Sequence, residues 1–140
     1  MTGEYRVQHV RQQDCYAMWK QVRDLLTPAI EQTHGRWKPE YVFSALIFGQ
    51  QTLWVVLKDE EIFAAFTTEI LTYPERKMIN VHYLGGNGFD QWYPLMRDEV
   101  IKFGRICGCD GVELNARFGF WKWLKHDGFK RASCFYEKKI

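Results

Sequence analysis

Apolar residues recur every three or four positions in the first third of the chain, a spacing typical of helices that bury one face. One helix is predicted over residues 15–26, with Asp14 as its N-cap and Pro28 at or near its end. Pro39 suits the first turn of a second, shorter helix. Residues 5–10 alternate between apolar and polar side chains, which predicts an opening strand before both helices.

The period of the pattern changes at about residue 52, and three successive strands are predicted from there. Residues 53–57 form an uninterrupted apolar run, and residues 62–71 follow after a charged turn. Residues 78–84 make the third strand of what is expected to be an antiparallel meander. In this third strand the side chains alternate, with Ile79, Val81 and Tyr83 predicted on one face and Asn80 and His82 on the other.

A cluster of glycines at residues 85–88 separates the meander from the longest helical pattern, at residues 90–107. A short strand at 111–115, a helix at 117–126 and a terminal strand at 129–140 complete the chain. A crossover helix imposes a parallel, right-handed connection, so the third meander strand should run parallel to the strand at 111–115. The fold class is therefore α/β, a mixed sheet with helices on both faces, in one domain over residues 1–140.

Charge and cysteine content narrow the classes of function. The charges of the 19 basic and 17 acidic residues nearly cancel, which leaves a net charge of +2. This is not the strongly positive charge that is typical of proteins that bind nucleic acid. No apolar run approaches membrane-spanning length, so a membrane partner is not expected. The four cysteines form no paired framework, which favours a reducing, cytoplasmic compartment. Cys107 and Cys109 are too closely spaced for a zinc knuckle, and no metal site is predicted.

The order of elements over residues 52–140 resembles that of the GNAT superfamily of N-acetyltransferases. The family carries an acetyl-CoA motif of Gln or Arg, two residues, Gly, one residue, then Gly or Ala. Tyr83-Leu84-Gly85-Gly86-Asn87-Gly88 is similar to that motif, with Tyr83 in place of its first residue. Asn115 and the segment at 125–129 are similar to the family's later motif. The resemblance implies a GNAT-like fold, acetyl-CoA as cofactor, and an amine of a small molecule or a protein as acceptor.

The glycine turn has a physical rationale for binding a pyrophosphate. Glycines let backbone N–H groups approach phosphates, and the N-terminus of the following helix adds a positive dipole. The residues that the resemblance assigns to the cofactor are Tyr83, Leu84, Gly85, Gly86, Asn87, Gly88 and Asn115. Asp90 does not fit a phosphate site, since its negatively charged carboxylate would lie near the phosphates and repel them. An ordinary strand-to-helix turn explains the same glycines without any ligand.

Acyl transfer to an amine also requires a base, and in many GNAT enzymes a tyrosine serves as acid to the leaving thiolate. The family position of that tyrosine holds Leu124 here, so Tyr136 in the predicted last strand is the substitute candidate. His82 is the first candidate base, because histidine ordinarily titrates close to neutral pH and this one precedes the glycines. Glu69 and Glu113 are the other two candidates.

Three hypotheses remain open from the sequence. The first is an acetyl-CoA-dependent N-acetyltransferase. The second is a GNAT-fold protein without catalysis that serves as a binding or structural component with a protein partner. Here the aromatic-rich segment at 83–92 is similar to small GNAT-like proteins of tailed bacteriophages, some of them virion-associated. The third is an unrelated α/β domain in which the glycine turn is incidental.

Overall fold

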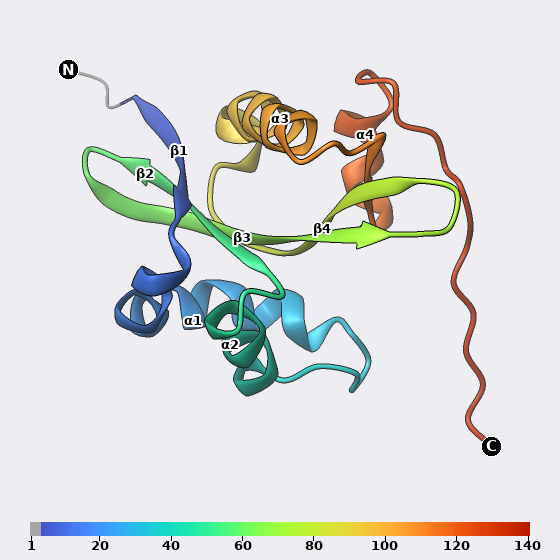
Figure 1. Cartoon of the computed structure of the whole chain (residues 1–140), viewed down its shortest axis with the longest axis horizontal. Helices are drawn as coiled ribbons and strands as arrows, with labels where there is room; N and C mark the ends of the chain where they lie inside the picture. The colour runs from blue at the N-terminus through green and yellow to red at the C-terminus, as the bar shows by residue number, and fades with distance from the viewer. Residues whose placement is uncertain (1–3) are drawn as a thin grey trace.

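Five strands form one mixed sheet whose spatial order is the order of the chain (Figure 1). The computed structural model describes residues 4–140, except for the side chain of Phe118. The first four strands pair antiparallel, and the last pair is parallel. The strands are β1 (Tyr5–Val10), β2 (Thr52–Lys58), β3 (Glu61–Thr72), β4 (Lys77–Gly86) and β5 (Gly111–Leu114).

Helices cover both faces of this sheet (Figure 1). On one face lie α1 (Cys15–Glu31) and α2 (Pro39–Ile47), and on the other lies α3 (Phe89–Ile106) with the short α4 (Trp121–Leu124). Two single-turn 3₁₀ helices, η1 (Gln12–Asp14) and η2 (Phe118–Phe120), precede α1 and α4. The α/β class, the meander and the parallel β4–α3–β5 unit predicted from the sequence are thus confirmed. None of the helices in the described part of the chain combines the length and apolarity needed to cross a membrane.

The sheet separates two hydrophobic cores. Leu26, Leu46 and Leu53 are fully buried between the sheet and the α1–α2 pair. On the α3 side, Trp54 stacks on Phe66 with ring centroids 5.6 Å apart, and its indole N–H donates to Thr68 Oγ1 at 3.0 Å. Much of the aromatic content of the chain is therefore used to build this second core rather than to bind a ligand.

Three details of the predicted elements are wrong. Pro28 lies inside α1, which continues to Glu31. The helix predicted over 117–126 is reduced to η2 and α4. No strand forms over 129–140; this segment runs extended beside the domain, and residues 131–140 are exposed (Figure 1). Arg36 holds the tail through a 3.0 Å ion pair with Glu137.

A β-bulge in β4 corrects the predicted alternation of that strand. Phe66 of β3 pairs with Leu84, but Thr68 pairs with Val81, so two residues, His82 and Tyr83, lie opposite Thr67. The extra residue reverses the side-chain alternation after His82. Tyr83 therefore joins the core under α1 and α2, on the opposite face from Val81. The bulge places the side chains of His82 and Tyr83 next to each other on one face, with ring centroids 5.4 Å apart.

Candidate functional site

Two of the three candidate bases meet on the sheet face that α1 and α2 cover. Glu69 of β3 pairs with Asn80 of β4, and His82 follows two residues later on the same face. The Nε2 atom of His82 lies 2.6 Å from Oε1 of Glu69. Their side chains are 22% and 28% exposed, so the pair is sheltered but reachable from solvent. A carboxylate held against one ring nitrogen fixes the orientation of the imidazole, which is what a positioned base requires.

The third candidate base, Glu113 of β5, is held in a separate network. Its Oε1 accepts hydrogen bonds from Asn80 Nδ2 at 3.2 Å and from the Tyr73 hydroxyl at 2.5 Å. The hydrogen bond from Tyr73 to Glu113 is the main cause that raises the pKa of Tyr73 above its ordinary value, followed by burial and by the charges of Glu113 and Glu69. Because two donors already occupy Glu113, it is a weaker candidate for removing a proton from a substrate than His82 is. Tyr73 was not among the candidate residues selected from the sequence, since no sequence signal marked it as a neighbour of the site.

Packing within the fold requires glycine at positions 85 and 86, the first two glycines of the turn. A Cβ atom on Gly85 would lie 1.7 Å from the backbone oxygen of Leu25 in α1. A Cβ atom on Gly86, whose φ is +128°, would lie 2.4 Å from the Cβ of Ala64 in the neighbouring strand. Gly88 adopts a left-handed conformation with φ +69° as the N-cap of α3. The fold alone therefore accounts for these glycines, whether or not a phosphate ever lies there.

The backbone around the turn still fits an extended cofactor. The pairing of β4 with β5 ends at Val81 and Leu114. Beyond it β4 continues to Gly86, and no strand within residues 4–140 pairs with it on that side. Among the described residues, no side chain caps the N-terminus of α3, which leaves backbone N–H groups of its first turn for a ligand. Asp90 in that first turn adds the negative charge that the sequence indicated, at a cost to an anion bound there.

Tyr83, Leu84 and Asn87 contribute to this region in different ways. The side chain of Tyr83 is buried on the α1–α2 face, where burial is the main cause that raises its pKa. Leu84 packs partly buried against the α3-side core. The carbonyl oxygen of Asn87 accepts a 2.7 Å hydrogen bond from the indole of Trp92, which ties the turn to α3. Asn115 follows β5 directly and is exposed.

An aromatic cluster surrounds Phe89, the first residue of α3. The ring of Phe89 lies 5.1 Å from that of Phe120 and 4.8 Å from that of Trp123, measured between centroids. Leu124 packs beside these residues in the α3-side core and brings no hydroxyl group. Tyr136, the substitute acid, is 87% exposed in the C-terminal tail. The structure therefore does not bring Tyr136 into contact with the His82–Glu69 pair.

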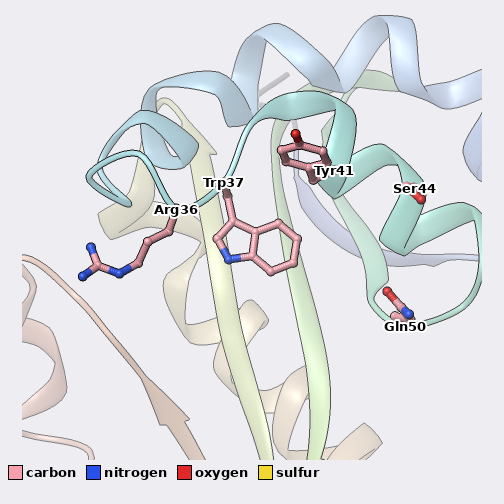
Figure 2. A pocket seen from close by; sticks show the side chains of 5 residues that line it. All are labelled: Arg36, Trp37, Tyr41, Ser44 and Gln50. Carbon is pink, nitrogen blue, oxygen red and sulfur yellow. The ribbon is translucent and has the colours of Figure 1, made fainter.

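A hollow of about 350 Å³ opens beside the loop between α1 and α2 (Figure 2). We call it the Trp37 hollow after one of its lining residues. The centroid of the Trp37 ring lies 6.2 Å from that of Tyr83, and the Tyr83 ring stacks beside that of His82. No candidate residue was selected from the sequence in this loop. The residues that line the hollow are Arg36, Trp37, Tyr41, Ser44 and Gln50.

Similarity to known proteins is found in structure and not in sequence. No protein-family model matches the chain, and no curated protein matches it. An aminoglycoside acetyltransferase from an uncultured soil metagenomic sample superposes with a TM-score of 0.74 at 12% identity, covering 98% of this chain and 99% of that one. A GCN5-related N-acetyltransferase from Ralstonia eutropha JMP134 gives 0.71 at 10%, covering 97% and 99%.

A third similar structure, solved with acetyl-CoA, is a predicted acetyltransferase from Clostridium acetobutylicum. Its TM-score is 0.68 at 10% identity, with 97% of this chain and 96% of that chain covered. At sequence identities this low, the similarity establishes the fold of the chain but not its substrate. Over nearly its whole length, the chain therefore has the fold of the GNAT acetyltransferases, as its order of elements predicted.

Proposed function

We propose that this protein is an acetyl-CoA-dependent N-acetyltransferase in which His82 is the base and Glu69 orients it. The observation that carries the proposal is the 2.6 Å contact between His82 Nε2 and Glu69 Oε1, two residues selected as candidates separately. With the Glu69 carboxylate as acceptor, Nε2 donates the hydrogen and Nδ1 is left to take a proton from the amine. Glu69 then stabilises the imidazolium that forms.

Acetyl-CoA, when bound, supplies an acetyl group activated as a thioester. The backbone of β4 from Leu84 to Gly88 and the uncapped start of α3 are the groups that would hold it, with Asn115 across the opening. The side chain of Tyr83 is buried in the core under α1 and α2, so only its backbone is available to the cofactor. Because His82 lies in the same strand just before these residues, the base and the proposed cofactor site are adjacent.

Turnover is expected to be slow because neither of the two positions considered for the acid, 124 and 136, offers a group placed to protonate the leaving thiolate. Leu124 cannot donate a proton, and Tyr136 is exposed in the tail. A missing general acid typically costs about a hundredfold in rate. Water is then the proton donor. We expect the reaction to run in the cytoplasm, where the four free thiols of the chain would stay reduced.

A second function is favoured by a different observation, the aromatic cluster of Phe89, Phe120 and Trp123 around the first residue of α3. A side-chain cluster of this size at the proposed phosphate site suits a GNAT-fold protein that no longer catalyses. It would act as a binding or structural component with a protein partner, and a bacteriophage virion is one setting for it.

Calorimetric titration with acetyl-CoA separates the two functions. Micromolar binding, followed by release of free thiol in the presence of a panel of small and peptide amines, supports the transferase. The same assay on His82→Ala should show retained binding and strongly reduced thiol release. Absence of acetyl-CoA binding would contradict the transferase and support the non-catalytic component.

A further inference from the structure

We infer that residues 117–140, which we call the basic segment, are a docking site for an acidic polypeptide in extended conformation. This inference goes beyond acetyl transfer and does not depend on it. It starts from the uneven distribution of charge along the chain. The basic segment has seven lysines and arginines against two carboxylates, a net charge of +5. Residues 1–116 have 12 basic and 15 acidic residues, a net charge of −3, so the small net charge of the whole chain conceals a strongly basic part.

The positive charge of the basic segment is presented to solvent. Its five lysines and two arginines are all exposed. Its two carboxylates are paired with cations outside it, Asp127 with Arg97 at 3.1 Å and Glu137 with Arg36 at 3.0 Å. Within residues 4–140, none of the five lysines forms an ion pair. An exposed charge of this sign attracts an anionic partner.

The backbone at the end of the basic segment favours a polypeptide as that partner. Residues 132–140 belong to no helix or strand, and within the described chain their backbone groups make no backbone–backbone hydrogen bond. Figure 1 shows this part of the chain running extended beside the domain. An extended peptide can pair with such a backbone as a neighbouring strand. A polynucleotide or a lipid surface cannot form that ladder of main-chain hydrogen bonds.

The tryptophans of the basic segment favour carboxylates over nucleotide bases. The ammonium of Lys122 lies 4.4 Å from the ring centroid of Trp123, and the guanidinium of Arg131 lies 4.5 Å from that of Trp121. Single-stranded nucleic acid binds chiefly by stacking its bases on exposed aromatic rings. Both tryptophans are only partly exposed, and each has a cation over one face of its ring. Because the Trp123 ring holds Lys122 in place, less side-chain entropy is lost when this cation binds a carboxylate.

The test is a titration of the full chain with three anionic probes, an oligoglutamate peptide, an oligouridylate of equal charge and vesicles that contain phosphatidylserine. Oligoglutamate should bind at least about tenfold more tightly than either of the others, because only it adds main-chain hydrogen bonds to the attraction of charges. Its affinity should fall as salt screens those charges. Equal or tighter binding of oligouridylate or of the vesicles, or no binding of oligoglutamate, would overturn the inference.

A second peptide tests the pairing of backbones. Oligoglutamate that is N-methylated at alternate residues keeps its charge but loses half of its N–H donors, and it should bind about tenfold more weakly. The amide hydrogens of residues 132–140 should exchange at least about tenfold more slowly when unmodified oligoglutamate is bound, since they are then hydrogen-bonded. Equal affinity of the two peptides, or unchanged exchange in the tail, would show that the peptide does not pair with this backbone and would reject the inference.

Charge-reversed variants locate the site. Lys138→Glu combined with Lys139→Glu should weaken oligoglutamate binding about tenfold or more, because attractive pairs are replaced by repulsive ones. The matched control combines Lys20→Glu with Lys102→Glu, two exposed lysines outside the basic segment, and changes the net charge equally. Its affinity should stay within about twofold of the wild type, since distant charges are screened. Circular dichroism checks that both proteins are folded. Equal losses of affinity would mean that oligoglutamate responds only to net charge, and would contradict the assignment.

Discussion

His82 Nε2 and Glu69 Oε1 lie 2.6 Å apart across the pairing of β3 with β4, on the face that α1 and α2 cover. If His82 removes the proton from the amine, His82→Ala should lower kcat/KM for acetyl transfer by about 10²–10⁴. Glu69→Gln keeps the size of the partner but removes its charge, and about a tenfold to hundredfold loss is expected. Steady-state rates of acetyl transfer, measured for the two variants and the wild type, check both values.

Tyr136→Phe is the matched control for these two variants. Its hydroxyl is on a ring that is 87% exposed in the tail, so the rate should not change. If His82→Ala turns over as fast as the wild type, the base is elsewhere, and Glu113→Gln becomes the variant to measure. Acetyl-CoA affinity, measured in parallel, should be nearly the same in all of these proteins.

Gly85→Ala should destabilise the protein strongly. Its new Cβ would lie 1.7 Å from the Leu25 oxygen, and that oxygen belongs to the backbone of α1, so the helix itself must move. Overpacking of this kind costs about 3 kcal/mol. The measurement is urea unfolding, where the midpoint should fall without a large change in slope. Gly119→Ala is the control, because among the described residues no atom outside its two chain neighbours lies within 4 Å of its added Cβ. A fall in both midpoints would contradict the packing explanation.

Tyr73 should ionise at a higher pH than a free tyrosine, as followed by its ultraviolet difference spectrum. The pKa is raised because the neutral phenol donates a hydrogen bond to Glu113. The sign follows: this contribution to folding stability is complete below the ordinary tyrosine pKa and is lost as the pH rises through the folded-state value. Glu113→Gln should return the pKa of Tyr73 toward 10.0. An unchanged titration in that variant would mean that the hydrogen bond does not form in solution.

Local patterns predicted the elements well because their causes are local. Apolar periodicity located the meander and α3, and a crossover helix required β4 and β5 to be parallel. The β4 bulge could not be predicted, since the shift from Val81 to Leu84 depends on pairing with β3 and leaves no mark in the residue types. For that reason Tyr83 was placed on the wrong face.

The candidate site divides in the same way. His82 and Glu69 could be selected from the sequence because their chemistry is visible in the residue types, but their contact depends on strand register. The Trp37 hollow was missed because its walls come from a loop, a helix and a bend that meet only in the folded chain. The tail was wrongly predicted as a strand, since the residue types over 129–140 do not show whether the segment pairs with the sheet.

Arg36→Ala should release the C-terminal tail. Arg36 holds Glu137 by an ion pair and stacks over Phe135, and the residues of the tail are otherwise exposed. Both partners are on the surface, so the free energy of unfolding should change by less than about 1 kcal/mol. Limited digestion with trypsin should cut the variant near Lys138 and Lys139 faster than the wild type. Arg6→Ala, which removes another surface ion pair at Glu60, is the control, and equal digestion rates in all three proteins would contradict the prediction.

Asp90→Asn tests whether phosphates lie at the start of α3. Asp90 is in the first turn of that helix. Its carboxylate interacts favourably with the helix dipole there but would repel a bound anion. Two like charges about 4 Å apart interact by about 1 kcal/mol in water, so removing one should strengthen acetyl-CoA binding about fivefold. The same change should lower helix stability by about 0.3–1 kcal/mol, because a favourable interaction with the dipole is lost. We therefore expect the variant to bind acetyl-CoA more tightly and to have a lower free energy of unfolding.

The control is Asp98→Asn. Asp98 lies eight residues further along the same helix, about 12 Å away, so this change should leave the affinity for acetyl-CoA unchanged. The gain should also shrink in high salt, since exposed charges are screened there. If Asp90→Asn binds acetyl-CoA no more tightly than Asp98→Asn does, then the phosphates, if bound at all, are not held at the glycine turn.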